Sequence, residues 1–491
     1  MKNSITIKTC LAPITAACSL ALAASPTFAL DYYLAAKPYT KILPDGSNVP
    51  MWGYVEDAGG ACYNAADNLT RQTCIAALPA PTLPGPRISV PVGDTLTVSL
   101  SNGLPEPTSI IIPGQERPTS TAGNGPTWND GSTGPRANAA QKVRSYGREA
   151  AANGGRELYI WSATNGNELT RSGTFLYHSG THPQKQVYMG LYGAVTRDAA
   201  AGQVYPGVSY DNEVMLFYSD IDPAINQAVA NGTYTTSIDY QARWFLINGE
   251  PYNPATKTSP EMSIPAGASG TKTLVRFLST ASETHVPALQ GLYAAIHGED
   301  GLQYNYQEGG MSTPSPREQY SIELPPLKTR DAIVTAPANG AYAVYDGNGY
   351  MTNPSDPADP ASTGDTAGGM LRFLSFSEAN LLPSALADIN TAEEGGVAAG
   401  GNVLSNDNPG DAPASVTAAS QGDRTIALGE EFVTAIGGRL ILNTDGSYRY
   451  IPPASGSLTA NVAEVFSYTI TDANGDTSRA TLTVTVADVS P

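Results

Sequence analysis

Residues 173–194 read GTFLYHSGTHPQKQVYMGLYGA, and this stretch decides the class of fold. Apolar and aromatic residues lie on both sides of a polar centre, which predicts two β-strands, GTFLYH and GLYGAVT, joined by a turn. Two of the four histidines, His178 and His182, stand between the strands. On an unbroken strand two such residues are about 13 Å apart, too far to share one metal ion. Gly180 between them permits a bulge or tight loop that brings the pair together.

The same strand pattern recurs along the whole chain. Forty-nine glycines, 38 prolines and 41% hydrophobic residues indicate many short strands joined by turns. The plausible helices are short, for example at residues 222–229. After about residue 382 the composition shifts to Gly, Ala, Thr and Asp, and Asn474-Gly475 predicts a hairpin turn. We therefore predict an all-β protein with modules at 30–203, 204–378 and 379–491.

The N-terminus has the features of a secretory signal peptide over residues 1–29. Two lysines precede an apolar run, and small residues follow near Ala29. No later apolar run approaches the ~20 residues that span a bilayer, so no transmembrane segment is expected. The chain should be exported to the periplasm, the cell surface or the medium. An oxidising compartment favours a disulfide between Cys62 and Cys74.

Charge and motifs exclude several classes of function. The formal net charge of −18 repels phosphate backbones, so we expect no nucleic-acid partner. Neither Gly-x-Ser-x-Gly nor His-Glu-x-x-His occurs. The segment Asp472–Asp476 imitates the start of a calcium loop but lacks the later glutamate, which favours a hairpin turn.

Several ordered motifs resemble those of bacterial multicopper oxidases. They are GPRISVPVGDTLTVSLSNGLPEPTSIIIPGQ from Gly85, the opening stretch from Gly173, RWFLINGEPY from Arg243 and LKTRDAIVTAPANGAYAVYD from Leu327. The resemblance spans roughly residues 85–376 and implies two plastocyanin-like (cupredoxin) Greek-key β-sandwiches. The tail, with GNVLSNDNPGD, NTDGSYRYIPP and FSYTITDANGD, resembles the cadherin-like or Ig-like modules of bacterial surface proteins. It implies a third β-sandwich.

The resemblance also implies copper, but the ligands are too few. The family's trinuclear cluster takes eight imidazoles from His-x-His-type strands, and its blue copper takes two histidines and a thiolate. This chain has four histidines in total. Ile111 and Pro113 stand where the family has its first ligand pair. His178 and His182 match the second pair, with two residues inserted between them.

A later segment, THVPALQGL, matches a His-rich family motif in which only His285 is retained. His178, His182 and His285 are therefore the candidate metal ligands, and copper is the cofactor that the resemblance implies. The alternative is that these imidazoles only hydrogen-bond buried backbone or carboxylates. His297, before an acidic turn, is expected to be structural. No His-Cys-His segment follows, so we expect no blue-copper centre.

Three functions remain open on the sequence. The first is an exported multicopper-oxidase-like protein that binds copper at a reduced site. The second is a non-catalytic surface or matrix scaffold, whose C-terminal module contacts a cell-surface or matrix partner. The third is an oxidase with an atypical mono- or dinuclear copper site that acts on phenols or metal ions.

Overall fold

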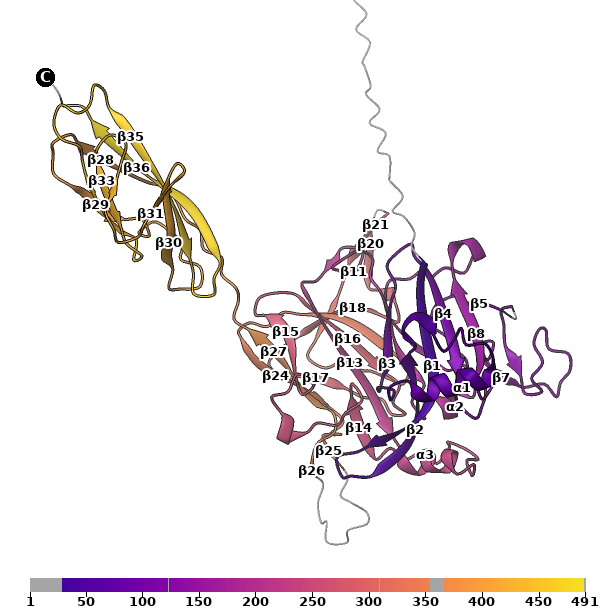
Figure 1. The fold of residues 1–491 in the computed structure, drawn as a ribbon. Coiled ribbons are helices and arrows are strands. Elements are labelled where there is room, and N and C mark those ends of the chain that lie inside the picture. The colour runs from indigo at the N-terminus through magenta and orange to yellow at the C-terminus, as the bar shows by residue number, and fades with distance from the viewer. Residues whose placement is uncertain (1–28, 122, 309, 354–365, 490–491) are drawn as a thin grey trace, which may run out of the picture. The chain divides into compact units, whose positions relative to one another are not determined.

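The computed structural model describes residues 29–121, 123–308, 310–353 and 366–489. The predicted signal peptide lies outside these residues, apart from Ala29. The chain divides into two compact units: the first runs to Gly267 and resumes over Thr271–Phe376, and the second contains Ala268–Gly270 and the chain from Ser377. Strands dominate both units (Figure 1), which confirms the all-β class. None of the described helices has the length and apolar character needed to span a bilayer.

The first sandwich pairs a five-stranded sheet with a three-stranded one. The larger sheet has the order β2-β1-β4-β8-β5 and the smaller β3-β10-β9. Their bounds are β1 Ala29–Ile42, β2 Asn48–Glu56, β3 Gly85–Ser89, β4 Thr95–Asn102, β5 Thr119–Ser120, β8 Gly155–Trp161, β9 Gly173–His178 and β10 Tyr192–Arg197. The predicted strands of the opening stretch, β9 and β10, are antiparallel neighbours with Tyr192 opposite His178.

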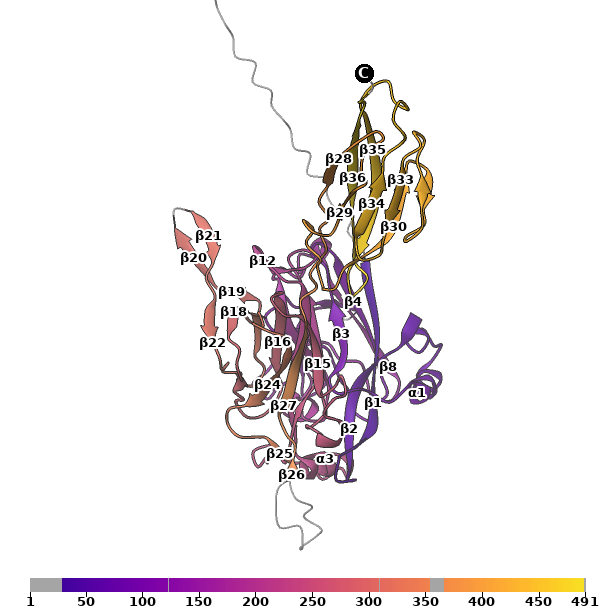
Figure 2. The same cartoon turned by 90° about the vertical axis from the view of Figure 1, so that its left-hand side faces the viewer.

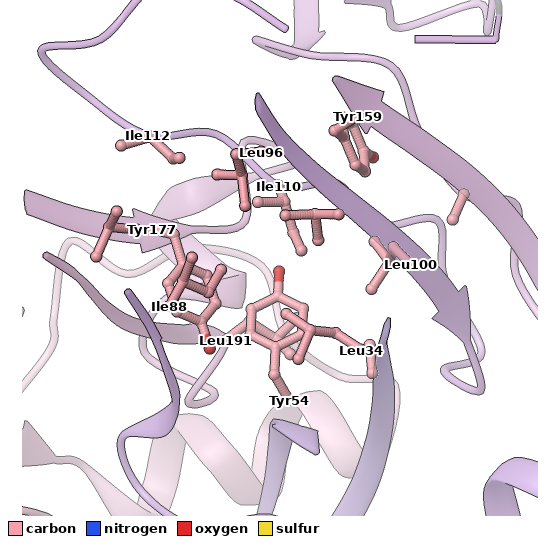
Figure 3. Packing of buried hydrophobic residues seen from close by; sticks show 14 of the residues in the cluster. Leu34, Tyr54, Ile88, Leu96, Leu100, Ile110, Ile112, Tyr159, Tyr177 and Leu191 are labelled. Carbon is pink, nitrogen blue, oxygen red and sulfur yellow. The ribbon is translucent and has the colours of Figure 1, made fainter. Parts of the chain in front are cut away.

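Alternating side chains from both sheets fill the space between them. Leu34 of β1, Leu96 and Leu100 of β4, Ile88 of β3 and Tyr177 of β9 are buried in one cluster (Figure 3). Because successive residues of a strand point to opposite faces, one side of each sheet supplies this core.

The second sandwich has a larger sheet in the order β14-β13-β16-β23-β18-β19, with β22 also paired to β18, and a smaller sheet in the order β15-β27-β24-β17. The bounds are β13 Asn212–Ile221, β14 Trp244–Ile247, β15 Ser263–Ala268, β16 Thr273–Ser279, β17 Pro287–Leu289, β18 Ala294–Glu299, β19 Leu302–Gln303, β22 Arg317–Gln319, β23 Thr329–Val334, β24 Gly340–Asp346 and β27 Leu371–Ser377. A shared apolar cluster, with Leu176 and Tyr192 from the first sandwich and Phe217 and Trp244 from the second, joins the two.

The C-terminal unit is a separate sandwich with its own core. Its sheets run β28-β36-β35-β30-β31 and β29-β34-β33-β32. The bounds are β28 Asp388–Glu393, β29 Ala399–Asn402, β30 Ser415–Gln421, β31 Arg424–Ile426, β32 Phe432–Val433, β33 Arg439–Leu442, β34 Ser447–Ile451, β35 Val462–Thr471 and β36 Thr477–Ala487. The predicted hairpin is β35–β36, and Gly475 turns it at a φ of 100°, a value that glycine adopts without strain.

The remaining elements are short helices, 3₁₀ turns and two-stranded ribbons. The helices are α1 Asn68–Ala77, α2 Pro183–Gln186 and α3 Pro223–Ala230, with 3₁₀ turns at Ala58–Gly60, Ala163–Asn165 and Pro254–Thr256. The two-stranded ribbons pair β6 Thr127–Trp128 with β7 Val143–Ser145, β11 Gln203–Tyr205 with β12 Val208–Ser209, β20 Asn305–Glu308 with β21 Met311–Pro314, and β25 Thr352–Asn353 with β26 Thr366–Ala367. The predicted helix at 222–229 is α3, and Asp222 caps its N-terminus. The Cys62–Cys74 disulfide is present and ties the loop before α1 to that helix.

Candidate metal centre

His178 ends β9 and lies directly opposite Ile111. The Ile111 N–H donates to the His178 carbonyl at 3.0 Å, and the His178 N–H donates back to the Ile111 carbonyl at 3.0 Å. A reciprocal pair of this kind puts both side chains on the same face of the ladder. The side chain beside the imidazole is therefore an aliphatic one that cannot bind a metal.

Ile111 also fills the space that a ligand would need. A Cβ placed on Gly180 would lie 2.9 Å from Ile111 Cγ2, and one placed on Gly147 would lie 3.4 Å from the same methyl. The inserted Gly180 thus lets the branched side chain pack against bare backbone. At this position the chain therefore offers a closely packed methyl group and no atom that could coordinate a metal ion.

Buried hydroxyl groups satisfy one another beside this pair. Ser109 Oγ accepts the Gly180 N–H at 3.1 Å and the Thr181 hydroxyl at 3.0 Å, and it lies 3.0 Å from Ser145 Oγ. These side chains are all buried. Each of these buried hydroxyl groups therefore already has a hydrogen-bond partner within the protein, and none needs an ion to satisfy it.

Gln186, at the end of α2, organises a second part of this network. Its Oε1 accepts the Thr108 hydroxyl at 2.9 Å and the Ser179 hydroxyl at 2.6 Å, and its Nε2 donates to the Pro107 carbonyl at 2.9 Å. Gln186, the glutamine of the motif that resembles the multicopper oxidases, therefore has a structural role here: it holds three neighbouring residues by hydrogen bonds.

The His178 imidazole itself is neutral and has one free nitrogen. Its Nδ1 lies 2.9 Å from the Ser179 carbonyl, so Nδ1 carries the proton and Nε2 has the lone pair. Burial lowers the pKa of His178, although the Ser179 carbonyl acts in the opposite direction. Nε2 is buried and has no hydrogen-bond partner among the described residues. A single imidazole nitrogen of this kind is competent as one ligand but is not a site by itself.

His182 lies beyond the insertion and starts α2. Its backbone is left-handed at φ 39° and ψ 57°, and its N–H donates to the Arg144 carbonyl at 2.9 Å. Burial and the nearby Lys185 ammonium lower the pKa of this half-buried imidazole. The insertion therefore converts the strand into a helix start at the second histidine.

His285 is held inside the second sandwich by a carboxylate. Its Nδ1 lies 3.2 Å from Asp346 Oδ2, and both side chains are fully buried. The pKa of Asp346 is lowered: burial opposes this, but the His285 bond and the Val286 N–H outweigh it. The ring lies among Tyr218, Phe245 and Tyr350, and its Nε2 is also buried with no hydrogen-bond partner in the part of the chain that the structure describes.

The three candidate histidines do not form one ligand set. Across the described parts of the chain, no three His, Cys, Asp or Glu side chains are grouped so that they could hold a metal ion. The described cysteines, Cys62 and Cys74, are joined to each other. The side chains of the described residues thus do not supply the ligand set of a trinuclear or a blue copper centre. Binding of a single ion at His178, His182 or His285 stays a prediction.

Comparison with protein families agrees with the sequence motifs. Residues 76–200 match the multicopper oxidase family, and residues 380–488 match the bacterial cadherin-like domain. The chain is multicopper-oxidase-like and ends in a bacterial cadherin-like domain. A comparison with curated proteins finds no match.

Solved multicopper oxidases are among the structural neighbours of this multicopper-oxidase-like chain. The blue copper oxidase from Nitrosomonas europaea is 16% identical with a TM-score of 0.47, over 71% of this chain and 86% of its own. The metallo-oxidase from Campylobacter jejuni is 13% identical with a TM-score of 0.44, over 92% and 91%. The laccase from Botrytis aclada is 15% identical with a TM-score of 0.45, over 93% and 88%. Identities this low do not transfer an activity.

The structure adds partners that the sequence motifs did not identify. Ser109 and Ser145 take part in the network beside His178, and Asp346 orients His285 from 61 residues away. A serine in a loop, such as Ser109, or at the end of a short strand, such as Ser145, carries no local signal of such contacts. Asp346 ends the strand motif AYAVYD, and nothing in that motif marks it as a partner of a histidine.

Proposed function

We propose that this chain is an exported, non-catalytic binding protein, which retains the multicopper oxidase scaffold without its oxygen-reducing copper centres. The observation that carries this proposal is the hydrogen-bonded pairing of His178 with Ile111, whose methyl groups pack against Gly180 and Gly147. Four-electron reduction of oxygen needs several adjacent coppers, and this position supplies one imidazole.

The domain organisation supports the same proposal. Plastocyanin-like modules at 30–203 and 204–378 would present a rigid β-surface, and the cadherin-like module at 379–491 would attach it to a cell-surface or matrix partner. The signal peptide predicted for residues 1–29 supports the export part of the proposal. The net charge of −18 argues against nucleic acid as the partner.

A reduced copper site is the second candidate, because the Nε2 atoms of His178 and His285 are buried and unpartnered among the described residues. In such a site Ser179 and Asp346 would fix the ring tautomers so that Nε2 faces the ion. The third candidate function is an atypical oxidase, and it requires that this reduced copper site exists.

Copper analysis separates these functions. Purified chain is reconstituted with Cu(II), freed of excess metal, and examined by metal analysis and electron paramagnetic resonance. We expect well below one copper per chain, and no difference between the wild type, the His178→Ala/His182→Ala variant and His285→Ala. His297→Ala is the matched control, because it removes an imidazole outside the candidate set. One tightly bound copper that is lost in a candidate variant but kept in the control would refute the scaffold proposal.

A further inference from the structure

An open strand edge lies at the margin of the second sandwich. β22 pairs with β18, and the described structure gives it no second neighbour (Figure 2). The chain then continues beside β17, where the Ile322 N–H donates to the Pro287 carbonyl at 2.9 Å and Ser321 bridges Ala288. An edge of this kind accepts an extended peptide as an added strand.

A pocket of about 490 Å³ lies along this edge, and two exposed tyrosines form part of its wall. Tyr293 is 65% exposed and Tyr320 is 59% exposed. Their ring centroids are 6.2 Å apart and their planes meet at 89°, so the rings form a right-angled corner. Large aromatic side chains left in water beside a pocket are typical of recognition surfaces.

The negative charge of the pocket favours a positively charged ligand. Glu318 and Glu323 line it with Gln319 and Ser321, and no lysine or arginine does. Both carboxylates are exposed, and neither belongs to an ion pair within the described structure. The neighbouring Arg317 is engaged elsewhere, with its guanidinium 4.6 Å from the Tyr304 ring centre. Aromatic faces and unpaired carboxylates both attract cations.

We propose that this pocket binds a Lys- or Arg-bearing extended segment of a partner protein. The segment would add to the open edge of β22, place a cationic side chain in the corner of Tyr293 and Tyr320, and pair it with Glu318 and Glu323. A neutral glycan would need the rings but not the carboxylates, and an anionic partner would be repelled. The inference deepens the proposed binding function by naming the class of partner.

Peptide binding to the purified full chain tests the proposal. The probe is a fluorescein-labelled (Lys-Thr)₅ peptide followed by anisotropy, with (Glu-Thr)₅ as the charge-reversed control and a soluble neutral β-glucan as competitor. We expect saturable binding of the lysine peptide only. Tyr293→Ala/Tyr320→Ala and Glu318→Gln/Glu323→Gln should each weaken it about tenfold or more, because each variant removes one of the two attractive elements.

A matched variant separates the pocket from bulk charge. Tyr306→Ala/Glu308→Gln removes an exposed ring and an exposed carboxylate from β20, outside the pocket lining, and should leave the affinity within about twofold. Equal affinity of the pocket and β20 variants would overturn the proposal, as would Tyr-dependent binding of the glucan without binding of the peptide. The assay does not depend on copper, so its failure is distinct from failure of the copper experiment.

Discussion

Replacing Arg276 with methionine tests whether a buried charge network holds the two sandwiches of the first unit together. Arg276 lies on β16 and is fully buried. Its guanidinium bonds Asp198 at 2.6 Å and Thr174 Oγ1 at 3.0 Å, and its Nε donates to Glu213. Burial by itself would lower the pKa of Arg276, but the surrounding carboxylates raise it, so the side chain is charged at every ordinary pH.

The expected loss in unfolding free energy follows from the buried carboxylate that Arg276→Met would leave without a counter-charge. Asp331 is also fully buried and lies 3.8 Å from Arg276 Nη1. It accepts the Thr174 N–H at 3.0 Å and the Tyr205 hydroxyl at 2.7 Å. Removing one partner of a buried ion pair costs roughly 3–5 kcal/mol, because the other charge stays uncompensated. We expect Arg276→Met to lower the unfolding free energy of the first unit by about that amount.

Tryptophan fluorescence gives a selective assay. The four tryptophans, at positions 52, 128, 161 and 244, all belong to the first unit, so urea unfolding followed by their emission does not report the C-terminal sandwich. The Arg276→Met/Asp331→Asn variant should lose less than the sum of its single changes, with a coupling of about 1–3 kcal/mol.

Arg87→Gln is the matched control for this measurement. The Arg87 side chain is 37% exposed and pairs with the same Glu213 at 2.8 Å, so its loss should cost less than about 1 kcal/mol. If Arg276→Met costs no more than Arg87→Gln, or if the double variant is additive, the two sandwiches are not held by this charge network.

Three further predictions concern the candidate site and the disulfide. Burial lowers the pKa of His178 below 6.5, so near and below that pH the unfolded chain binds more protons than the folded one. The unfolding free energy should therefore fall as the pH drops through and below 6.5. His178→Gln should flatten this pH dependence, and an unchanged slope in the variant would contradict the prediction. Gly180→Ala should cost about 1–3 kcal/mol by forcing a Cβ against Ile111, and much less in an Ile111→Ala background, as urea unfolding would show. Cys62→Ser/Cys74→Ser should cost about 2–3 kcal/mol, because the disulfide closes a short loop in the unfolded chain; a reducing agent should then destabilise only the wild type.

Local pattern was enough to predict the strands. The apolar and aromatic residues of GTFLYH and GLYGA correspond to β9 and β10, and Asn474-Gly475 turns the predicted β35–β36 hairpin. These features depend on side-chain period and on glycine conformations, which are properties of a few consecutive residues. The helix α1 was not predicted, although Asp67 accepts the Thr70 N–H as an N-cap and gave a usable signal.

The sequence by itself determined the all-β class, the cadherin-like tail, the Cys62–Cys74 pairing and the shortage of histidines for a copper cluster. Only the tertiary structure decided what stands around each remaining histidine. Ile111 opposite His178, and Asp346 beside His285, are pairings over 67 and 61 residues of chain. Cross-strand register is set by packing between segments that are distant in the sequence, and a local sequence pattern does not specify which segment becomes the neighbour.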